Sequence, residues 1–326
     1  MSGERRGTAG GRKPAPRRPR SNPSARPKSE AVEIRTSDGW SLRADVDAPA
    51  GEPVGVAVLA HAMMARRTEF DRPLGAGVRQ LLLARGWRVV SFDFRGHGDS
   101  GPRAGDGGEY SYDDLVTQDL PAVYAFARAG DRKKRRVVLV GHSLGGHVGL
   151  AAQGTGLVAF DRIALVAASL WMPQFESSRR QRLVHRLLLG ALVASARRVG
   201  RVPVRALRMG SDDEARAYFE DLTRFRTTGR WTSADGRADY LASLASVRVP
   251  VMQVVSAGDR LACPPAGGAK LLARCGGPRE LVQIDRADDG GAPPGHMGIV
   301  TSGRVARVWD RVEAWMRAPA LAPPVF

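Results

Sequence analysis

The sequence is poor in cysteine, in lysine and in long apolar runs. Only Cys263 and Cys275 occur among 326 residues, too few for a disulfide framework or a cysteine-based metal site. No run of 18 or more apolar residues is present, so we expect no transmembrane helix. The charged amino terminus lacks the apolar stretch of a secretion signal. These absences favour a cytoplasmic protein with reduced thiols.

Lysine is scarce, but the formal net charge is +17 because arginine supplies most of the positive charge. Nine basic residues lie in the first 29 positions, beside the single acid Glu4. This stretch, residues 1–29, is rich in Arg, Pro, Gly and Ser and has no apolar periodicity, so we predict a disordered basic tail. A tail of this kind can bind phosphate backbones weakly through counterion release. We expect no specific nucleic-acid partner.

The remaining chain alternates between apolar strand-like runs and helical segments. Residues 31–35 and 40–45 flank an Asp38-Gly39 turn, which predicts a β-hairpin. Six Val-rich runs follow, at residues 55–60, 88–94, 136–140, 162–168, 249–255 and 280–284. Uninterrupted apolar runs are typical of strands buried on both faces of a parallel sheet. We therefore predict an α/β fold with a doubly wound, mostly parallel sheet.

Helix signals lie between these runs. A proline opens residues 73–85, Ser111 and Asp114 form a possible capping box before residues 111–129, and Pro121 indicates a kink or restart there. The last helix is expected over residues 303–317.

About eighty residues between the fourth and fifth of the six runs contain only helical signals. We predict that residues 171–246 form a helical cap on a core made of residues 30–170 and 247–318. In its first helix, Leu183 and Leu187 are expected to belong to the buried apolar stripe and His185 to face solvent beside arginines. Ser211 with Glu214 predicts the start of a second helix, and a third should follow Thr232. A lesser hypothesis lays the basic first helix on a membrane surface.

The clearest chemical motif is the Gly-x-Ser-x-Gly pentad Gly141–Gly145, centred on Ser143. It follows a predicted buried strand and opens a predicted helix, which is the context of a nucleophile elbow. The glycines allow close backbone approach, and the helix directs N–H groups toward the reacting carbonyl. Ser143 is thus the predicted nucleophile.

A nucleophilic serine needs a histidine base and an acid that orients it. His296 lies in a loop between the last predicted strand and the last predicted helix, where the base of this arrangement is expected. Asp259 follows the strand at residues 249–255 and is the favoured acid. The group Asp285, Asp288 and Asp289 competes with it, being nearer to His296 in sequence.

An oxyanion hole requires two N–H donors. One should come from Leu144, directly after the nucleophile, and the other from Met63 in the loop after residues 55–60. His61 and His142 are further candidates for the substrate pocket, although for His61 a structural role, with its ring bonded to the backbone of the loop, is the preferred interpretation.

With these motifs the chain resembles the α/β-hydrolase superfamily, over about Ala31 to Ala318, in its esterase and serine-aminopeptidase-like branch. The matching motifs are His61–Met63, Asp93–Ser100, the elbow, and the pair Asp259 and His296. The resemblance implies acyl transfer without a cofactor or metal, and a bracing role for Asp93 and Arg95, with His97 near the pocket. The family usually has glycine where this chain has Ala62.

We therefore expect a serine hydrolase that cleaves a carboxylic ester, thioester or amide of a small to medium hydrophobic substrate. An acyltransferase on the same scaffold is the alternative within this chemistry. A non-enzymatic ligand-binding or nucleic-acid-binding protein is the alternative outside it.

Overall fold

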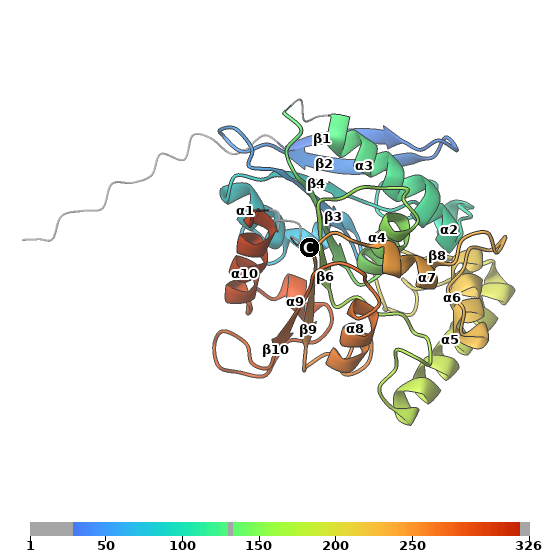
Figure 1. The fold of residues 1–326 in the computed structure, drawn as a ribbon. Coiled ribbons are helices and arrows are strands. Elements are labelled where there is room, and N and C mark those ends of the chain that lie inside the picture. The colour runs from blue at the N-terminus through green and yellow to red at the C-terminus, as the bar shows by residue number, and fades with distance from the viewer. Residues whose placement is uncertain (1–28, 130–132, 320–326) are drawn as a thin grey trace, which may run out of the picture.

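The protein is built around one eight-stranded sheet with helices on both faces (Figure 1). The computed structural model describes residues 29–129 and 133–319, so the predicted tail lies outside the described residues except for Ser29, which begins the first strand. The strand order is β1-β2-β4-β3-β5-β6-β9-β10. The β1–β2 and β2–β4 pairs are antiparallel, and every other pair in this sheet is parallel. The predicted doubly wound, mostly parallel sheet is confirmed.

The strands coincide with the predicted apolar runs to within a few residues. Their bounds are β1 (Ser29–Arg35), β2 (Ser41–Asp47), β3 (Val56–Ala60), β4 (Arg88–Phe92), β5 (Val137–His142), β6 (Arg162–Val166), β9 (Val251–Ser256) and β10 (Arg279–Ile284). All residues of β3, β5, β6 and β9 are buried. This burial explains why the central strands are apolar on both faces.

Alternation along each strand divides the interior into two apolar clusters. In β3, Val56 and Val58 face the cluster beneath α3 (Leu120–Ala129) and α4 (Leu144–Gly154), whereas Ala57 and Leu59 face the other. The second cluster is covered by α1 (Val78–Ala84), α9 (Gly298–Thr301) and α10 (Ala306–Arg317). The helix α8 (Pro265–Leu272) follows β9.

The predicted capping box at Ser111 and Asp114 is present at the start of α2 (Tyr112–Asp114). A π-helical turn, η3 (Leu115–Asp119), separates it from α3, whose second residue is Pro121. A proline cannot donate the backbone hydrogen bond of a regular helix, and the interruption lies directly before it. Two short 3-10 helices precede α2 in the chain, η1 (Arg67–Asp71) and η2 (Ala104–Asp106).

Between β6 and β9 the chain leaves the sheet and forms a mostly helical segment beside it (Figure 1). This segment contains α5 (Arg179–Val199), β7 (Arg201–Val202), β8 (Glu214–Ala215), α6 (Arg216–Thr228), α7 (Tyr240–Ser243) and η4 (Leu244–Ser246). The helices α5 and α6 pack against one another, and β7 and β8 form a short antiparallel pair.

Two details of this segment differ from the sequence prediction. The buried face of α5 contains His185, Leu189 and Leu192, whereas Leu183 and Leu187 are 47% and 62% exposed. The predicted buried face of α5 was therefore wrong, because the helix is rotated about its axis relative to the prediction. The predicted helix start at Ser211 was also wrong, since α6 begins at Arg216 and Glu214 lies in β8 with its side chain buried.

Within residues 29–129 and 133–319, no helix combines the length and the apolar character needed to cross a membrane.

Candidate active site

Ser143 occupies the turn between β5 and α4. Its backbone has φ 49° and ψ −107°, a left-handed conformation that is uncommon for a residue with a side chain. The amide of Ser143 donates to the carbonyl of Val166 at 2.8 Å, so the turn is tied to the end of β6. Backbone strain of this kind is found at functional sites, where the surrounding structure maintains it.

The glycines of the pentad are required by close backbone contacts. A Cβ atom at Gly145 would lie 2.2 Å from the carbonyl oxygen of Ala60, and one at Gly141 would lie 2.5 Å from the amide nitrogen of Gly146. Both distances are shorter than any normal van der Waals contact. The motif therefore brings α4 against β3 closely enough that only glycine fits.

Asp259 and His296 form a direct pair. The Nδ1 atom of His296 lies 2.5 Å from Oδ2 of Asp259, and the carboxylate also accepts the amides of Ala262 at 3.0 Å and Cys263 at 3.1 Å. Burial opposes ionisation of Asp259, but the hydrogen bond and charge of His296, together with these amides, hold its pKa below the usual value. An ionised Asp259 fixes the Nδ1–H tautomer of His296 and leaves Nε2 to take a proton.

The competing carboxylates have other partners. Asp289 accepts two hydrogen bonds from Arg304, both at 2.9 Å, and Asp288 accepts the amide of Arg307 at 3.0 Å. Asp285 accepts from Gln283. Among the residues that the structure describes, Asp259 is the carboxylate that contacts the His296 ring.

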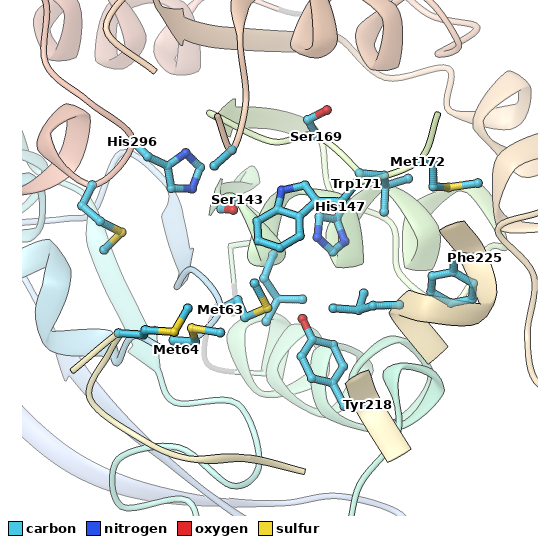
Figure 2. Close-up of a pocket in the computed structure, with 16 residues that line it drawn as sticks. Met63, Met64, Ser143, His147, Ser169, Trp171, Met172, Tyr218, Phe225 and His296 are labelled. Atoms are coloured by element: carbon cyan, nitrogen blue, oxygen red, sulfur yellow. The ribbon is translucent and has the colours of Figure 1, made fainter. Parts of the chain in front are cut away.

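Ser143 and His296 line the same cavity, which has a volume of about 220 Å³ (Figure 2). Figure 2 shows both at one side of it, with aromatic and methionine side chains around the remainder. The apolar lining residues are Met63, Met64, Leu144, Leu170, Trp171, Met172, Met209, Leu222, Phe225, Ala262 and Met297. No Asp, Glu, Lys or Arg side chain of the described residues lines it, so the cavity suits an uncharged, mainly apolar group.

The Met63 and Leu144 amides belong to residues that also line this cavity. Within the described part of the chain, neither amide donates a hydrogen bond. The amides on either side of Met63 are both occupied: Ala62 donates to Oε1 of Glu69 at 3.1 Å and Met64 to Oε1 of Glu214 at 2.7 Å. The buried carboxylates of Glu69 and Glu214 therefore hold the loop. The Met63 amide, which lies between the two bound amides in sequence, remains available as a hydrogen-bond donor.

His61 and His142 do not belong to the residues that line the cavity. His61 is fully buried, with Nδ1 at 2.7 Å from the carbonyl of Ala62 and Nε2 accepting the amide of Phe94 at 3.0 Å. Burial and the nearby His97 lower the pKa of His61 to about 4. His142 is buried beneath the site, where it contacts Glu69 at 2.9 Å and its ring centroid lies 5.1 Å from that of His296. Both histidine side chains are therefore packed in the protein interior, outside the lining of the cavity.

His97 also lies outside the cavity lining, in a buried network that includes Glu214. Its Nδ1 lies 3.0 Å from the carbonyl of Arg95 and its Nε2 lies 3.1 Å from Glu214. Because both ring nitrogens face acceptors, the imidazolium is the form that satisfies them. Burial opposes this charge, yet Glu214 raises the pKa of His97 to about 9. Tyr110 donates to the other Glu214 oxygen at 2.6 Å.

Asp93 and Arg95, in the loop after β4, make contacts that brace this loop. Arg67 donates its backbone amide to Asp93 at 2.7 Å and pairs with it through its guanidinium. Arg95 pairs with Asp119 at 2.6 Å and with Asp38 at 2.8 Å. These ion pairs connect the loop to η1, to η3 and to the β1–β2 turn.

His185 is buried, which corrects the expectation that it faces solvent. Its Nδ1 lies 2.6 Å from Glu176, and its ring stacks on Trp171 with centroids 4.4 Å apart. Arg226 of α6 pairs with the same carboxylate. This cluster joins α5 to α6 behind the Trp171 side chain that lines the cavity.

Glu69, Glu214 and His147 were not predicted as site residues. Glu69 and Glu214 lie far from the pentad in sequence, and no local pattern relates either to the loop that it holds. His147 could have been noticed, since it lies one helical turn after Ser143 on the same helix. No group of His, Cys, Asp and Glu side chains within the described ranges has the arrangement of a metal site.

The sequence matches the model of the alpha/beta hydrolase family over residues 57–320. The fold is similar to an esterase from Exiguobacterium antarcticum, with a TM-score of 0.60, 16% identity and coverage of 89% of this chain and 100% of that one. It is also similar to an esterase from Pyrococcus furiosus, with a TM-score of 0.60, 16% identity and coverage of 92% and 96%.

A thermophilic esterase from Thermogutta terrifontis gives a TM-score of 0.56 at 17% identity, covering 88% of this chain and 98% of its own. At these identities the structures show likeness of fold. Comparison with curated proteins gives no match. The family match extends over most of the sequence and agrees with the sheet order and the turn at Ser143, and the chain belongs to the alpha/beta hydrolase family.

Proposed function

We propose that the protein is a serine hydrolase that cleaves carboxylic esters of small to medium hydrophobic substrates, with Ser143, His296 and Asp259 as its catalytic triad. The observation that carries this proposal is the 2.5 Å contact between Asp259 and Nδ1 of His296, with His296 and the strained Ser143 lining one apolar cavity. A binding protein has no need of this combination.

In the proposed reaction, His296 accepts the Ser143 proton at Nε2 as the serine oxygen attacks the substrate carbonyl. Asp259 stabilises the imidazolium that forms. The imidazolium then protonates the leaving alcohol, and an acyl-enzyme remains on Ser143. A water molecule, deprotonated by His296, releases the acid and restores the serine. Thioesters and amides would react through the same steps.

The oxyanion of the tetrahedral intermediate is proposed to bind the amides of Met63 and Leu144. Donors held in advance by the fold stabilise this charge without reorganisation during the reaction. The occupied amides of Ala62 and Met64 support Met63 as the donor of its loop. Because Ala62 stands where glycine is usual, Glu69 and Glu214 would supply the restraint that defines the loop.

Residues 171–246 are proposed to act as a cap. Trp171, Met172, Tyr218 and Phe225 of this segment contribute to the cavity lining. Their apolar character would exclude water around the reacting carbonyl and favour a hydrophobic acyl or alcohol group.

A fluorophosphonate probe tests the nucleophile directly, since it should label the folded wild-type protein and fail to label Ser143→Ala. A panel of p-nitrophenyl esters of increasing acyl length then measures the substrate preference, with Ser143→Ala as the background. Equal labelling of both proteins, or none of either, would refute the assignment of Ser143.

A further inference from the structure

The mainly apolar cavity contains three polar side chains that the proposed reaction does not use, His147, Ser169 and Tyr218, of which His147 and Tyr218 carry ring-borne donors. His147 and Tyr218 line it together with Ser143 and His296. His147 lies in α4, four positions after Ser143, and its amide donates to the Ser143 carbonyl at 3.2 Å. Tyr218 comes from α6 in the inserted segment. A hydrogen-bonding group in an apolar pocket determines which ligands fit, because leaving it unpaired is costly.

The protonation of the His147 ring follows from its neighbour Tyr112. Nδ1 of His147 lies 2.9 Å from the Tyr112 hydroxyl. Burial raises the pKa of Tyr112 well above its usual value, so its proton is retained and needs an acceptor. If Tyr112 donates to Nδ1, the His147 proton lies on Nε2, away from Tyr112.

His147 is a neutral donor in this arrangement. Burial lowers the pKa of His147 to about 3, and no carboxylate among the described residues contacts its ring. The ring is held by stacking on Tyr112, with centroids 5.6 Å apart, and by the edge of Trp231 at 6.3 Å. These contacts fix the direction of the Nε2–H group.

The Tyr218 hydroxyl is the second donor. Its ring stacks on Tyr112 with centroids 6.4 Å apart, and in Figure 2 its hydroxyl points toward the interior of the cavity. Within the described residues this hydroxyl has no hydrogen-bond partner. Burial raises the pKa of Tyr218 well above its usual value, so the hydroxyl keeps its proton.

We propose that His147 and Tyr218 form a hydrogen-bonding subsite for an oxygen atom of the substrate additional to the ester group, such as an ether, ketone or hydroxyl oxygen. The inference rests on the proposed function and specifies its substrate class as oxygenated esters. The subsite lies about one helical turn from Ser143, so the additional oxygen is expected within a few bonds of the reacting carbonyl.

Pairs of esters that differ in one atom test this subsite. p-Nitrophenyl hexanoate is compared with its analogues in which an ether oxygen replaces the methylene at C3, C4 or C5, so that every analogue remains a carboxylic ester. A second series places the ether oxygen in the alcohol part of alkyl acetates, which distinguishes an acyl-side from an alcohol-side subsite. The measured quantity is the ratio of kcat/KM for each ether analogue to that of its all-carbon partner.

For at least one analogue, this ratio should fall about tenfold in Tyr218→Phe, which removes only the hydroxyl, and in His147→Phe, which keeps a ring. Tyr112→Phe, which frees the His147 tautomer, should give a smaller fall of about threefold. The control Leu222→Val alters an apolar lining residue and should change both members of each pair alike. Ratios that stay unchanged in both Tyr218→Phe and His147→Phe for every analogue would overturn the subsite.

Binding provides a readout that does not depend on turnover. Dissociation constants of the same ester pairs can be measured with Ser143→Ala protein through the change in tryptophan fluorescence, to which Trp171 in the cavity lining contributes. In Ser143→Ala, the preferred ether analogue should bind more tightly than its all-carbon partner. This difference in dissociation constant should be lost in the double variant that also contains Tyr218→Phe. A preference in binding together with no hydrolysis by the wild type would contradict the proposed function and leave the subsite supported.

Discussion

The carboxylate of Glu214 accepts the backbone amide of Met64 at 2.7 Å, which connects the inserted segment to the loop proposed to bind the oxyanion. Met64 has a φ of 63°, so the loop adopts a conformation that an unrestrained residue with a side chain rarely takes. Glu214 is fully buried and holds His97 and Tyr110 as well. A side chain 150 positions away thus determines the backbone beside Met63.

We predict that Glu214→Ala lowers kcat by about tenfold to a hundredfold with little change in KM. The reason is that a misplaced oxyanion donor weakens the transition state more than the bound substrate. Glu214→Gln keeps a carbonyl acceptor and should lose less. Steady-state kinetics and an unfolding curve for each variant separate this effect from a general loss of stability.

The neighbouring Asp213 provides the control, since it pairs with Arg201 at 2.8 Å in the same segment and, among the described residues, makes no hydrogen bond or ion pair to the Met64 loop. Asp213→Asn should leave kcat within about twofold of the wild type. An equal fall of kcat in Asp213→Asn and Glu214→Ala would contradict the positioning role of Glu214.

Two glycine substitutions should have opposite effects on stability. Gly145→Ala should lower the free energy of unfolding by at least about 2 kcal/mol, because its Cβ would lie 2.2 Å from the Ala60 carbonyl oxygen. Gly190→Ala should raise it by about 0.5–1 kcal/mol, since Gly190 is an exposed position of α5 with no atom near an added Cβ. Denaturant unfolding measures both, and destabilisation by Gly190→Ala would show that α5 packs differently.

Replacing each candidate carboxylate by its amide should distinguish Asp259 from its competitors by the loss of kcat. Asp259→Asn is expected to reduce kcat by about 10³–10⁴-fold, because it removes the charge that fixes the His296 tautomer and stabilises the imidazolium. Asp288→Asn should leave hydrolysis unchanged, as its carboxylate contacts the Arg307 amide. Ester hydrolysis measured beside circular dichroism checks both, and the reverse order of the two losses would reassign the acid.

Stability should decrease as the pH rises from about 6.5 toward 9 because of His97. Its pKa is about 9 in the folded protein and lies near 6.5 in an unfolded chain. The folded state therefore keeps a proton that the unfolded state releases in this window. The stabilisation is complete below about pH 6.5 and is lost as the pH passes the folded-state value, with a slope of at most about 1.4 kcal/mol per pH unit.

His97→Gln should flatten this dependence between pH 6.5 and 8. Urea unfolding at several pH values gives the two slopes. Parallel curves for wild type and variant would mean that His97 is neutral in the folded protein.

The sequence was sufficient to predict the sheet and the elements that flank Ser143, because buried parallel strands and the glycine pentad are local patterns. The rotation of α5 was not predictable in this way. Its leucines and arginines alternate so that a polar residue, His185, is buried against Glu176 and Trp171 while Leu183 and Leu187 are exposed. Only the tertiary partners of that helix determine which side is covered.

The Ser211 and Glu214 pair shows a second limit. Its spacing is that of a capping box, but Glu214 instead satisfies three buried donors from the Met64 amide, His97 and Tyr110. A buried carboxylate that satisfies distant donors gains more than one that caps a helix at the surface. Such a network has no signature in the sequence around any one of its members.

The thiol of Cys263 lies beside the acid of the proposed triad, where its amide contacts Asp259, its Sγ lies 3.5 Å from the carbonyl of Ala168 and none of its surface is exposed. Burial raises its pKa well above the usual range, and burial also raises the pKa of Cys275 to about 12. Thiolates are the species that react with disulfide reagents. Both cysteines should therefore react very slowly with such reagents in the folded protein. Reaction of Cys263 would then require the acid loop to open, so the rate of that reaction would report such an opening without any introduced label.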